Sequence, residues 1–211
     1  ILRFAVVFYG FRVTYGQVFG VGAEALIIDA IIVVGTFLLG WQLGTRFFGL
    51  DRDSSMLIGS GAAICGAAAV IATEGTLKSE PHKVSMAVAT VVIFGTISMF
   101  LYPVLYNSGI LGFDAKEYGI FVGATIHEVA QVVVAGNAMG EDAGTTAVIV
   151  KMTRVMMLAP FLIALAYFIS KSGKNGGQKS EIMIPWFAVY FLIVVGFNSL
   201  DLLPKIAVST I

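Results

Sequence analysis

The chain has 211 residues, of which 58% are hydrophobic and only 12% charged, and its 13 basic and 13 acidic residues balance to a formal charge of zero. Soluble domains carry about a quarter charged residues, so this composition, with a mean hydropathy of +0.92, excludes an ordinary soluble domain and predicts an all-α, multi-pass helical bundle in a lipid bilayer. No basic stripe is present that would bind nucleic acid, and the single cysteine excludes an internal disulfide framework.

Seven hydrophobic segments reach or approach the length of about 20 residues that a membrane span requires. In chain order they cover residues 2–20, 25–48, 56–73, 84–106, 117–136, 144–170 and 184–204. These runs are too continuous for the alternating strands of about ten residues that build a membrane barrel. No domain linker separates them, so we predict a single membrane domain over residues 1–211. Because the chain opens without methionine or a signal sequence, we expect it to be an internal piece of a longer polypeptide.

The first segment carries Arg12 near its middle, where a spanning helix should hold no cation. We therefore expect either a short, broken helix or an ion pair between Arg12 and Asp29 or Glu24.

The third segment, residues 56–73, is rich in glycine and alanine. Gly61 and Gly66 permit an interrupted helix here. The free backbone N–H groups at such a break could face an anion. Cys65 lies beside this expected break, and its apolar neighbours are typical of a small core residue rather than of a nucleophile.

The fifth segment places His127, Glu128 and Gln131 inside an otherwise apolar run. An ionisable group at membrane depth costs about 2.5–3.5 kcal/mol on insertion scales, so such groups usually face a protein interior or a water-filled path. His127 and Gln131 are four residues apart and are expected to share a helical face, where they would offer hydrogen bonds to a small oxyanion. His127 also suits proton coupling near neutral pH, and Glu128 would project toward another helix. The alternative is a buried polar cluster that only joins helices.

The third and fifth segments resemble each other. Residues 61–70 align with residues 123–132 at a constant offset of 62, so that Gly61 corresponds to Gly123 and Gly66 to Glu128. Paired elements of this kind build sites from broken helices in secondary transporters, which places Gly123 with the helix-break glycines. We expect the two copies to run parallel, so that any inverted repeat would involve sequence outside this chain. The alternative is a chance likeness between two spans rich in small residues.

The sixth segment carries Lys151 and Arg154, one helical turn apart within an apolar run. Two cations on one face suit an anionic ligand, and the guanidinium fork of Arg can hold a tetrahedral oxyanion. The alternatives are snorkelling toward the lipid headgroups, or ion pairs with Glu128 or Glu24.

Signatures of enzymes and cofactor proteins are missing from the sequence. A zinc peptidase requires a second histidine four residues after the first, but Gln131 stands there, and the other histidine, His82, follows Pro81 in an expected loop. There is no Walker loop, no dinucleotide-binding glycine pattern and no pair of haem histidines. We therefore predict no enzyme activity, no metal site and no cofactor.

Four blocks of sequence resemble the YeiH-type family of bacterial inner-membrane proteins, which are weakly characterised candidate sulfate exporters. The blocks are ICGAAAV at residues 64–70, HKVSMAVATVVIFG at 82–95, IHEVAQV at 126–132 and KMTRVMMLAP at 151–160. The resemblance covers essentially the whole chain and implies a multi-pass protein of the bacterial inner membrane. It also implies the inverted-repeat architecture of bile-acid symporters and sodium/proton antiporters, with crossing broken helices. Members of the family are longer than this chain, so the resemblance implies a fragment that lacks helices at both ends.

Three functional hypotheses remain open at this point. The first is a secondary transporter of a small anion, with sulfate as the candidate that the resemblance implies, in which His127, Gln131, Lys151 and Arg154 line the path. The second is a cation-coupled transporter of another metabolite, driven by protons or sodium, in which Glu128 matters most. The third is a membrane scaffold or intramembrane hydrolase. The sequence leaves open the substrate, the coupling ion, a homo-oligomeric state, and whether residues 56–73 and 117–136 span the membrane or re-enter it.

Overall fold

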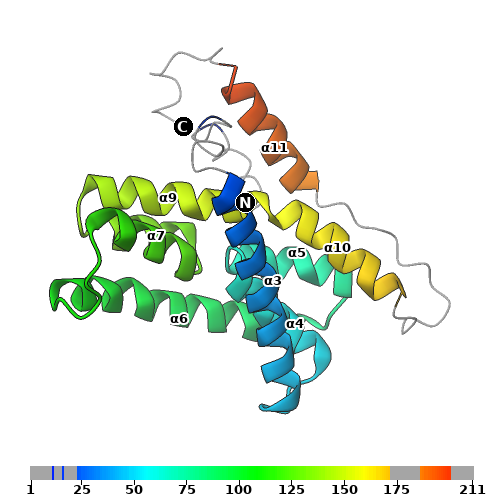
Figure 1. Cartoon of the computed structure of the whole chain (residues 1–211). Helices are drawn as coiled ribbons and strands as arrows, with labels where there is room; N and C mark the ends of the chain where they lie inside the picture. The colour runs from blue at the N-terminus through cyan, green and yellow to red at the C-terminus, as the bar shows by residue number, and fades with distance from the viewer. Residues whose placement is uncertain (1–10, 12–15, 17–22, 172–185, 201–211) are drawn as a thin grey trace.

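The computed structural model describes residues 11, 16, 23–171 and 186–200, and all regular structure within these ranges is helical (Figure 1). The helices are α3 (Ala23–Arg46), α4 (Arg52–Ala63), α5 (Ala67–Leu77), α6 (Pro81–Asn107), α7 (Ala115–Thr125), α8 (Val129–Asn137), α9 (Glu141–Met156), α10 (Leu158–Lys171) and α11 (Trp186–Asn198). Nearly all of the first predicted segment, including Arg12, lies outside the described residues. Within the described ranges, α6 and the run Glu141–Ile169 are long and apolar enough to cross a membrane.

The third predicted segment is a helical hairpin rather than one continuous helix. A straight helix over residues 52–77 would be about 39 Å long, and the six residues from Leu77 to Lys83 span at most about 22 Å. Yet the Lys83 ammonium lies 3.0 Å from Asp51, the residue that precedes α4. Helix α5 must therefore double back along α4. A Cβ built on Gly61 of α4 would come within 2.7 Å of Val70 of α5, which confirms that the two arms touch.

The fifth predicted segment is a second hairpin, made of α7 and α8. The Tyr118 hydroxyl donates a hydrogen bond to the Ala135 carbonyl over 3.2 Å, although the two residues are 17 positions apart, a separation of about 26 Å along a straight helix. A Cβ on Gly119 and one on Gly136 would both approach the Ala143 carbonyl of α9. Both arms of this hairpin therefore pack against the same turn of α9.

The two hairpins enter the bundle from opposite ends of α6. Lys83 at the start of α6 binds Asp51 at the base of the first hairpin, whereas Tyr106 near its end packs against Tyr118 in the second, with ring centroids 4.7 Å apart. Figure 1 shows α5 on the right and α7 on the left, with α6 running beneath both. The expectation that the two copies run parallel is therefore wrong. Each segment doubles back instead of crossing, so the single helix between them is enough to invert the second copy.

Each hairpin begins at an aspartate that caps its first helix. Asp51 accepts hydrogen bonds from the Ser54 amide over 3.2 Å and from the Ser54 hydroxyl over 2.6 Å. The Ser54 hydroxyl, and after it the Lys83 ammonium, outweigh partial desolvation and lower the pKa of Asp51 to about 2. The carboxylate is thus ionised at neutral pH and keeps its link to α6. Asp114 begins α7 in the same way, through a capping box with Glu117.

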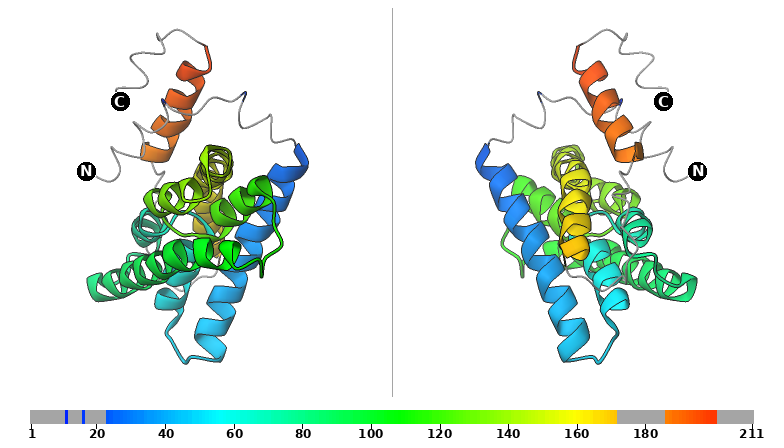
Figure 2. Two further views of the ribbon diagram at one scale, coloured as in Figure 1. Left: turned by 90° about the vertical axis from the view of Figure 1, so that its left-hand side faces the viewer. Right: turned by 90° about the vertical axis from the view of Figure 1, so that its right-hand side faces the viewer.

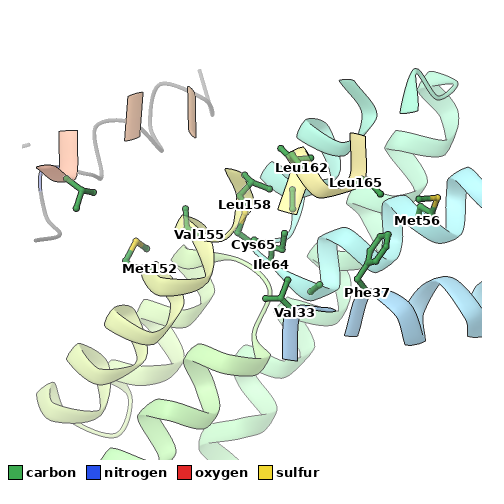
Figure 3. Close-up of a cluster of buried hydrophobic side chains, with 13 residues drawn as sticks. Val33, Phe37, Met56, Ile64, Cys65, Met152, Val155, Leu158, Leu162 and Leu165 are labelled. Carbon is green, nitrogen blue, oxygen red and sulfur yellow. The ribbon is translucent and has the colours of Figure 1, made fainter. Parts of the chain in front are cut away.

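The main core lies where the tip of the first hairpin meets α3, α9 and α10. Figure 3 shows Ile64 and Cys65 among apolar side chains from those helices, including Val33, Val155 and Leu158. Helices α3 and α4 approach closely because glycine faces glycine: a Cβ on Gly40 would lie 2.9 Å from the Cα of Gly59. This core holds the first hairpin against the long helix run α9–α10.

Large apolar side chains cover the outer faces of α3 and α6. Ile31, Leu39, Phe94 and Phe100 are each more than half exposed, as expected for helices whose surroundings are lipid rather than water. Helix α11 lies at the edge of the bundle (Figures 1 and 2), where it contacts α9 and α10.

Candidate functional site

The tips of the two hairpins form the centre of the candidate site. The first tip is residues 64–66, where α4 ends and α5 begins, and the second tip is residues 126–128, between α7 and α8. The two tips occupy equivalent positions of the sequence repeat at the offset of 62 residues. Two helices therefore end and two begin at this point, which brings two partial negative and two partial positive helix termini together.

Lys151 of α9 joins the two tips. Its side chain is 1% exposed, and its ammonium donates to the Ile64 carbonyl over 2.8 Å and to the Ile126 carbonyl over 2.7 Å. These carbonyls belong to the residues that cap the C-terminal ends of α4 and α7. One cation thus satisfies an orphan carbonyl on each of two helices and offsets the negative ends of both dipoles.

Glu128 lies at the helix N-termini of the two tips, those of α5 and α8. Its Oε1 accepts a hydrogen bond from the Ala67 amide, at the first residue of α5, over 2.6 Å. It also stands at the N-cap position of α8. A carboxylate is favourable at a helix N-terminus, because both the free N–H groups and the dipole attract negative charge. The second tip therefore supplies the anion that caps a helix of the first hairpin.

Gly66 leaves room for that carboxylate. Its φ of +68° lies in the region that favours glycine, and a Cβ at this position would collide with Oε1 of Glu128. The aligned residues at the two tips, Gly66 and Glu128, are thus complementary: one tip carries the carboxylate and the other carries the space for it.

Gln131 fixes the second tip to α6. Its side-chain oxygen accepts from the Glu128 amide over 3.3 Å, and its Nε2 donates to the Thr96 hydroxyl over 3.0 Å and to the Val92 carbonyl over 3.3 Å. Gly95 of α6 has no side chain here, and a Cβ on it would collide with the Gln131 amide. His127 lies in the turn and Gln131 in α8, so the two do not share the continuous helical face that their spacing predicted.

Arg154 forms an ion pair with Asp29 of α3. Its Nε lies 3.0 Å from Oδ1 of Asp29, and both side chains are less than a tenth exposed. This partner differs from the Glu128 or Glu24 expected from the sequence. Asp29 is an acid in an apolar segment, so the sequence signals a cationic partner for it, but the partner it suggests is Arg12 rather than Arg154.

Two buried polar atoms of the site have no hydrogen-bond partner among the described residues. They are Nδ1 of His127 and Nη2 of Arg154. A buried donor or acceptor without a partner costs about 1–3 kcal/mol, so such atoms usually serve a ligand or a bound water.

The structure brings five predicted path residues to the tips or next to them: His127 and Glu128 at the second tip, Gln131 beside it, and Lys151 and Arg154 on α9. Cys65 and Gly66 lie in the break of the first hairpin. Gly61 and Gly123 lie one turn earlier, inside α4 and α7. A Cβ on Gly61 would approach Val91 within 2.8 Å, and one on Gly123 would collide with the Ala147 carbonyl. Both glycines therefore allow close packing of the hairpins on α6 and α9.

We expect Gly66→Ala to lower the free energy of unfolding by about 3 kcal/mol, since strained backbone and overpacking each cost about 1–3 kcal/mol. Gly109→Ala is the matched control, because Gly109 also has a positive φ, +73°, but has no neighbour within 4 Å of a built Cβ. Unfolding by denaturant in detergent micelles measures both variants. Equal losses would show that only the backbone conformation, and not the fit around Glu128, restricts position 66.

Comparison with known proteins places the chain among membrane proteins. The family model described as conserved hypothetical protein 698 matches residues 1–211. The chain is 53% identical to the UPF0324 inner membrane protein YeiH of Escherichia coli strain K12 over 210 residues, which is 99% of this chain and 60% of that protein. It is 53% identical over 217 residues to a UPF0324 membrane protein of Yersinia pestis, again over 99% of the chain and 60% of the relative.

A UPF0324 membrane protein of Pseudomonas aeruginosa is 49% identical over 216 residues, covering 99% of the chain and 61% of the relative. The chain thus spans about 60% of the length of the relatives it matches. No solved structure matches it.

Proposed function

The chain belongs to the family of conserved hypothetical protein 698, and we propose that it forms the substrate-binding part of a secondary transporter for a small anion. Its relative in Escherichia coli is an inner membrane protein, and the exposed apolar faces of α3 and α6 fit the same location. Sulfate or another sulfur oxyanion is the substrate that the sequence resemblance favours.

One observation carries the proposal: Lys151 is buried and binds the tips of two hairpins that enter from opposite ends of the bundle. Hairpins that meet midway leave helix termini at membrane depth, and non-helical backbone is tolerated there only where protein buries it or a cavity solvates it. Discontinuous helices of this kind bind substrates and ions in secondary transporters. A scaffold would gain nothing from such an expensive arrangement.

The charges and free donors favour an anion as the substrate. Lys151 uses two of its three N–H groups on the tip carbonyls, and Arg154 keeps Nη2 unpaired among the described residues. Guanidinium and ammonium groups are the usual ligands of oxyanions. His127 adds a ring N–H donor, which the neutral imidazole already carries.

The test is anion flux by the full-length polypeptide in proteoliposomes, with radiolabelled sulfate as the probe. We expect His127→Ala and Arg154→Ala each to reduce the initial rate by at least about tenfold, the effect of losing one hydrogen bond to a charged group. Lys116→Ala, at an exposed position of α7, is the control and should transport normally. Unchanged flux in the two site variants would remove these residues from the transport path.

A second candidate is a transporter of another metabolite coupled to protons or sodium. The half-buried Glu128 favours it, because a carboxylate at membrane depth is a common proton or cation site. In that case flux would follow a proton or sodium gradient and ignore sulfate, and Glu128→Gln would abolish the coupling.

A further inference from the structure

Glu128 already occupies an anion site. Its carboxylate accepts the Ala67 amide at the N-terminus of α5, and Gly66 at the N-cap position of α5 supplies no capping side chain. The helix N-terminus of the first hairpin therefore holds a negative group that belongs to the second hairpin. A free oxyanion bound to this N-terminus would need the place that Oε1 of Glu128 now fills.

The four charges of the site balance in this state. Lys151 and Arg154 contribute two positive charges, and Asp29 and Glu128 contribute two negative charges. Lys151, Arg154 and Asp29 are buried, and Glu128 is half-buried between the two tips. An additional anion would leave a net negative charge in a low-dielectric interior, where uncompensated charge is expensive. Neutralising Glu128 removes that excess for a monovalent anion, lowers it by one charge for sulfate, and also releases the Ala67 amide.

We propose that Glu128 is a resident counter-anion that the transported anion displaces, and that the displacement requires Glu128 to take up one proton. The inference rests on the proposed function and deepens it. In the charged state, Oε1 accepts from the Ala67 amide. In the protonated state, the carboxylic acid of Glu128 moves away from the N-terminus of α5, and the Ala67 amide donates to the substrate anion instead. One proton and one anion then move together and in the same direction.

The groups around Glu128 support a single proton step. Among the described residues, Lys151 of α9 and the Cys65 thiol of the first tip are the titratable groups of other elements that interact with it, and His127 precedes it in its own tip. Lys151 remains bound to the Ile64 and Ile126 carbonyls in both states. It therefore keeps the two tips joined while the carboxylate exchanges with the anion.

Anion binding to the purified full-length protein between pH 5 and pH 8 tests the proposal. Sulfate, nitrate and chloride are suitable probes because they stay fully ionised over this range, so any pH dependence belongs to the protein. The tightest binder of the three is used for the titrations. We expect the wild-type affinity to fall with rising pH, by up to about tenfold per pH unit where Glu128 is ionised, as linkage to one proton requires.

Glu128→Gln is the decisive variant, because the amide keeps an oxygen for the Ala67 amide but carries no charge and does not titrate. We expect it to bind the anion with an affinity that does not vary with pH. Glu141→Gln, an exposed carboxylate in the first turn of α9, is the matched control and should keep the wild-type slope. Should Glu128→Gln fail to fold, proton uptake by the wild type in weakly buffered solution gives a second readout, with about one proton expected per anion bound.

Different results would overturn the counter-anion role of Glu128 and the proposed anion transport. Binding by the wild type that ignores pH, or an unchanged slope in Glu128→Gln, overturns the counter-anion role and leaves anion transport standing. Absence of binding and of flux for all three anions at every pH overturns the proposed function, and this inference with it.

Discussion

Lys151→Met is expected to lower the free energy of unfolding by about 3–5 kcal/mol, the usual cost of removing one member of a buried charged network. The ammonium is the partner of the Ile64 and Ile126 carbonyls. Without it, each carbonyl is left at the buried end of a helix at a cost of about 1–3 kcal/mol, and Glu128 loses its electrostatic interaction with a cation. Equilibrium unfolding in detergent micelles measures the loss.

Lys116→Met is the control for this experiment. Lys116 is an exposed lysine in the first turn of α7, and a surface change of this kind shifts stability by no more than about 0.5 kcal/mol. If Lys151→Met lowered the free energy of unfolding no more than Lys116→Met does, other groups would have to satisfy the Ile64 and Ile126 carbonyls. Lys151 would then not be the link between the tips.

The second large effect concerns the buried ion pair of Arg154 and Asp29. We expect Arg154→Met to lower the free energy of unfolding by about 3–5 kcal/mol, because it leaves the Asp29 carboxylate buried without its cation. The double variant Asp29→Asn with Arg154→Met should lose about 2 kcal/mol less than the sum of the two single losses, a coupling typical of residues in contact. Additive losses would contradict a direct energetic link between α3 and α9.

The same double variant separates stability from transport. If Arg154 contacts the anion through Nη2, restoring the charge balance will recover folding but not flux. Recovery of both would assign Arg154 a purely structural role. The exposed pair of Lys83 and Asp51 is the control for the stability loss, since an ion pair at the surface contributes little.

Much of the site could be recognised from residue chemistry. His127, Glu128, Lys151 and Arg154 stood out because ionisable groups are rare in apolar segments. The structure places all of them at or beside the hairpin tips. The repeat between residues 61–70 and 123–132 also located both helix breaks, since the break at residues 64–66 aligns with the break at 126–128.

The relative direction of the two copies of the repeat could not be predicted from residue chemistry in the same way. Hydropathy measures the length of an apolar run, and a hairpin of two half-helices buries about as many apolar residues as one spanning helix does. The contacts that distinguish the two are tertiary, such as the Tyr118 hydroxyl on the Ala135 carbonyl. For the same reason, the expected common face of His127 and Gln131 was lost when the helix broke between them.

Sequence alone determined that this protein is helical, that it belongs in a membrane and which polar residues lie in its apolar segments, because these properties depend on composition and local spacing. Tertiary structure alone decided which groups meet. The ion pair of Asp29 and Arg154 joins residues 125 positions apart, and Lys151 reaches carbonyls 87 and 25 positions away. Such pairings arise from the way helices pack, and a partner that lies on another helix leaves no trace in the local pattern of either segment.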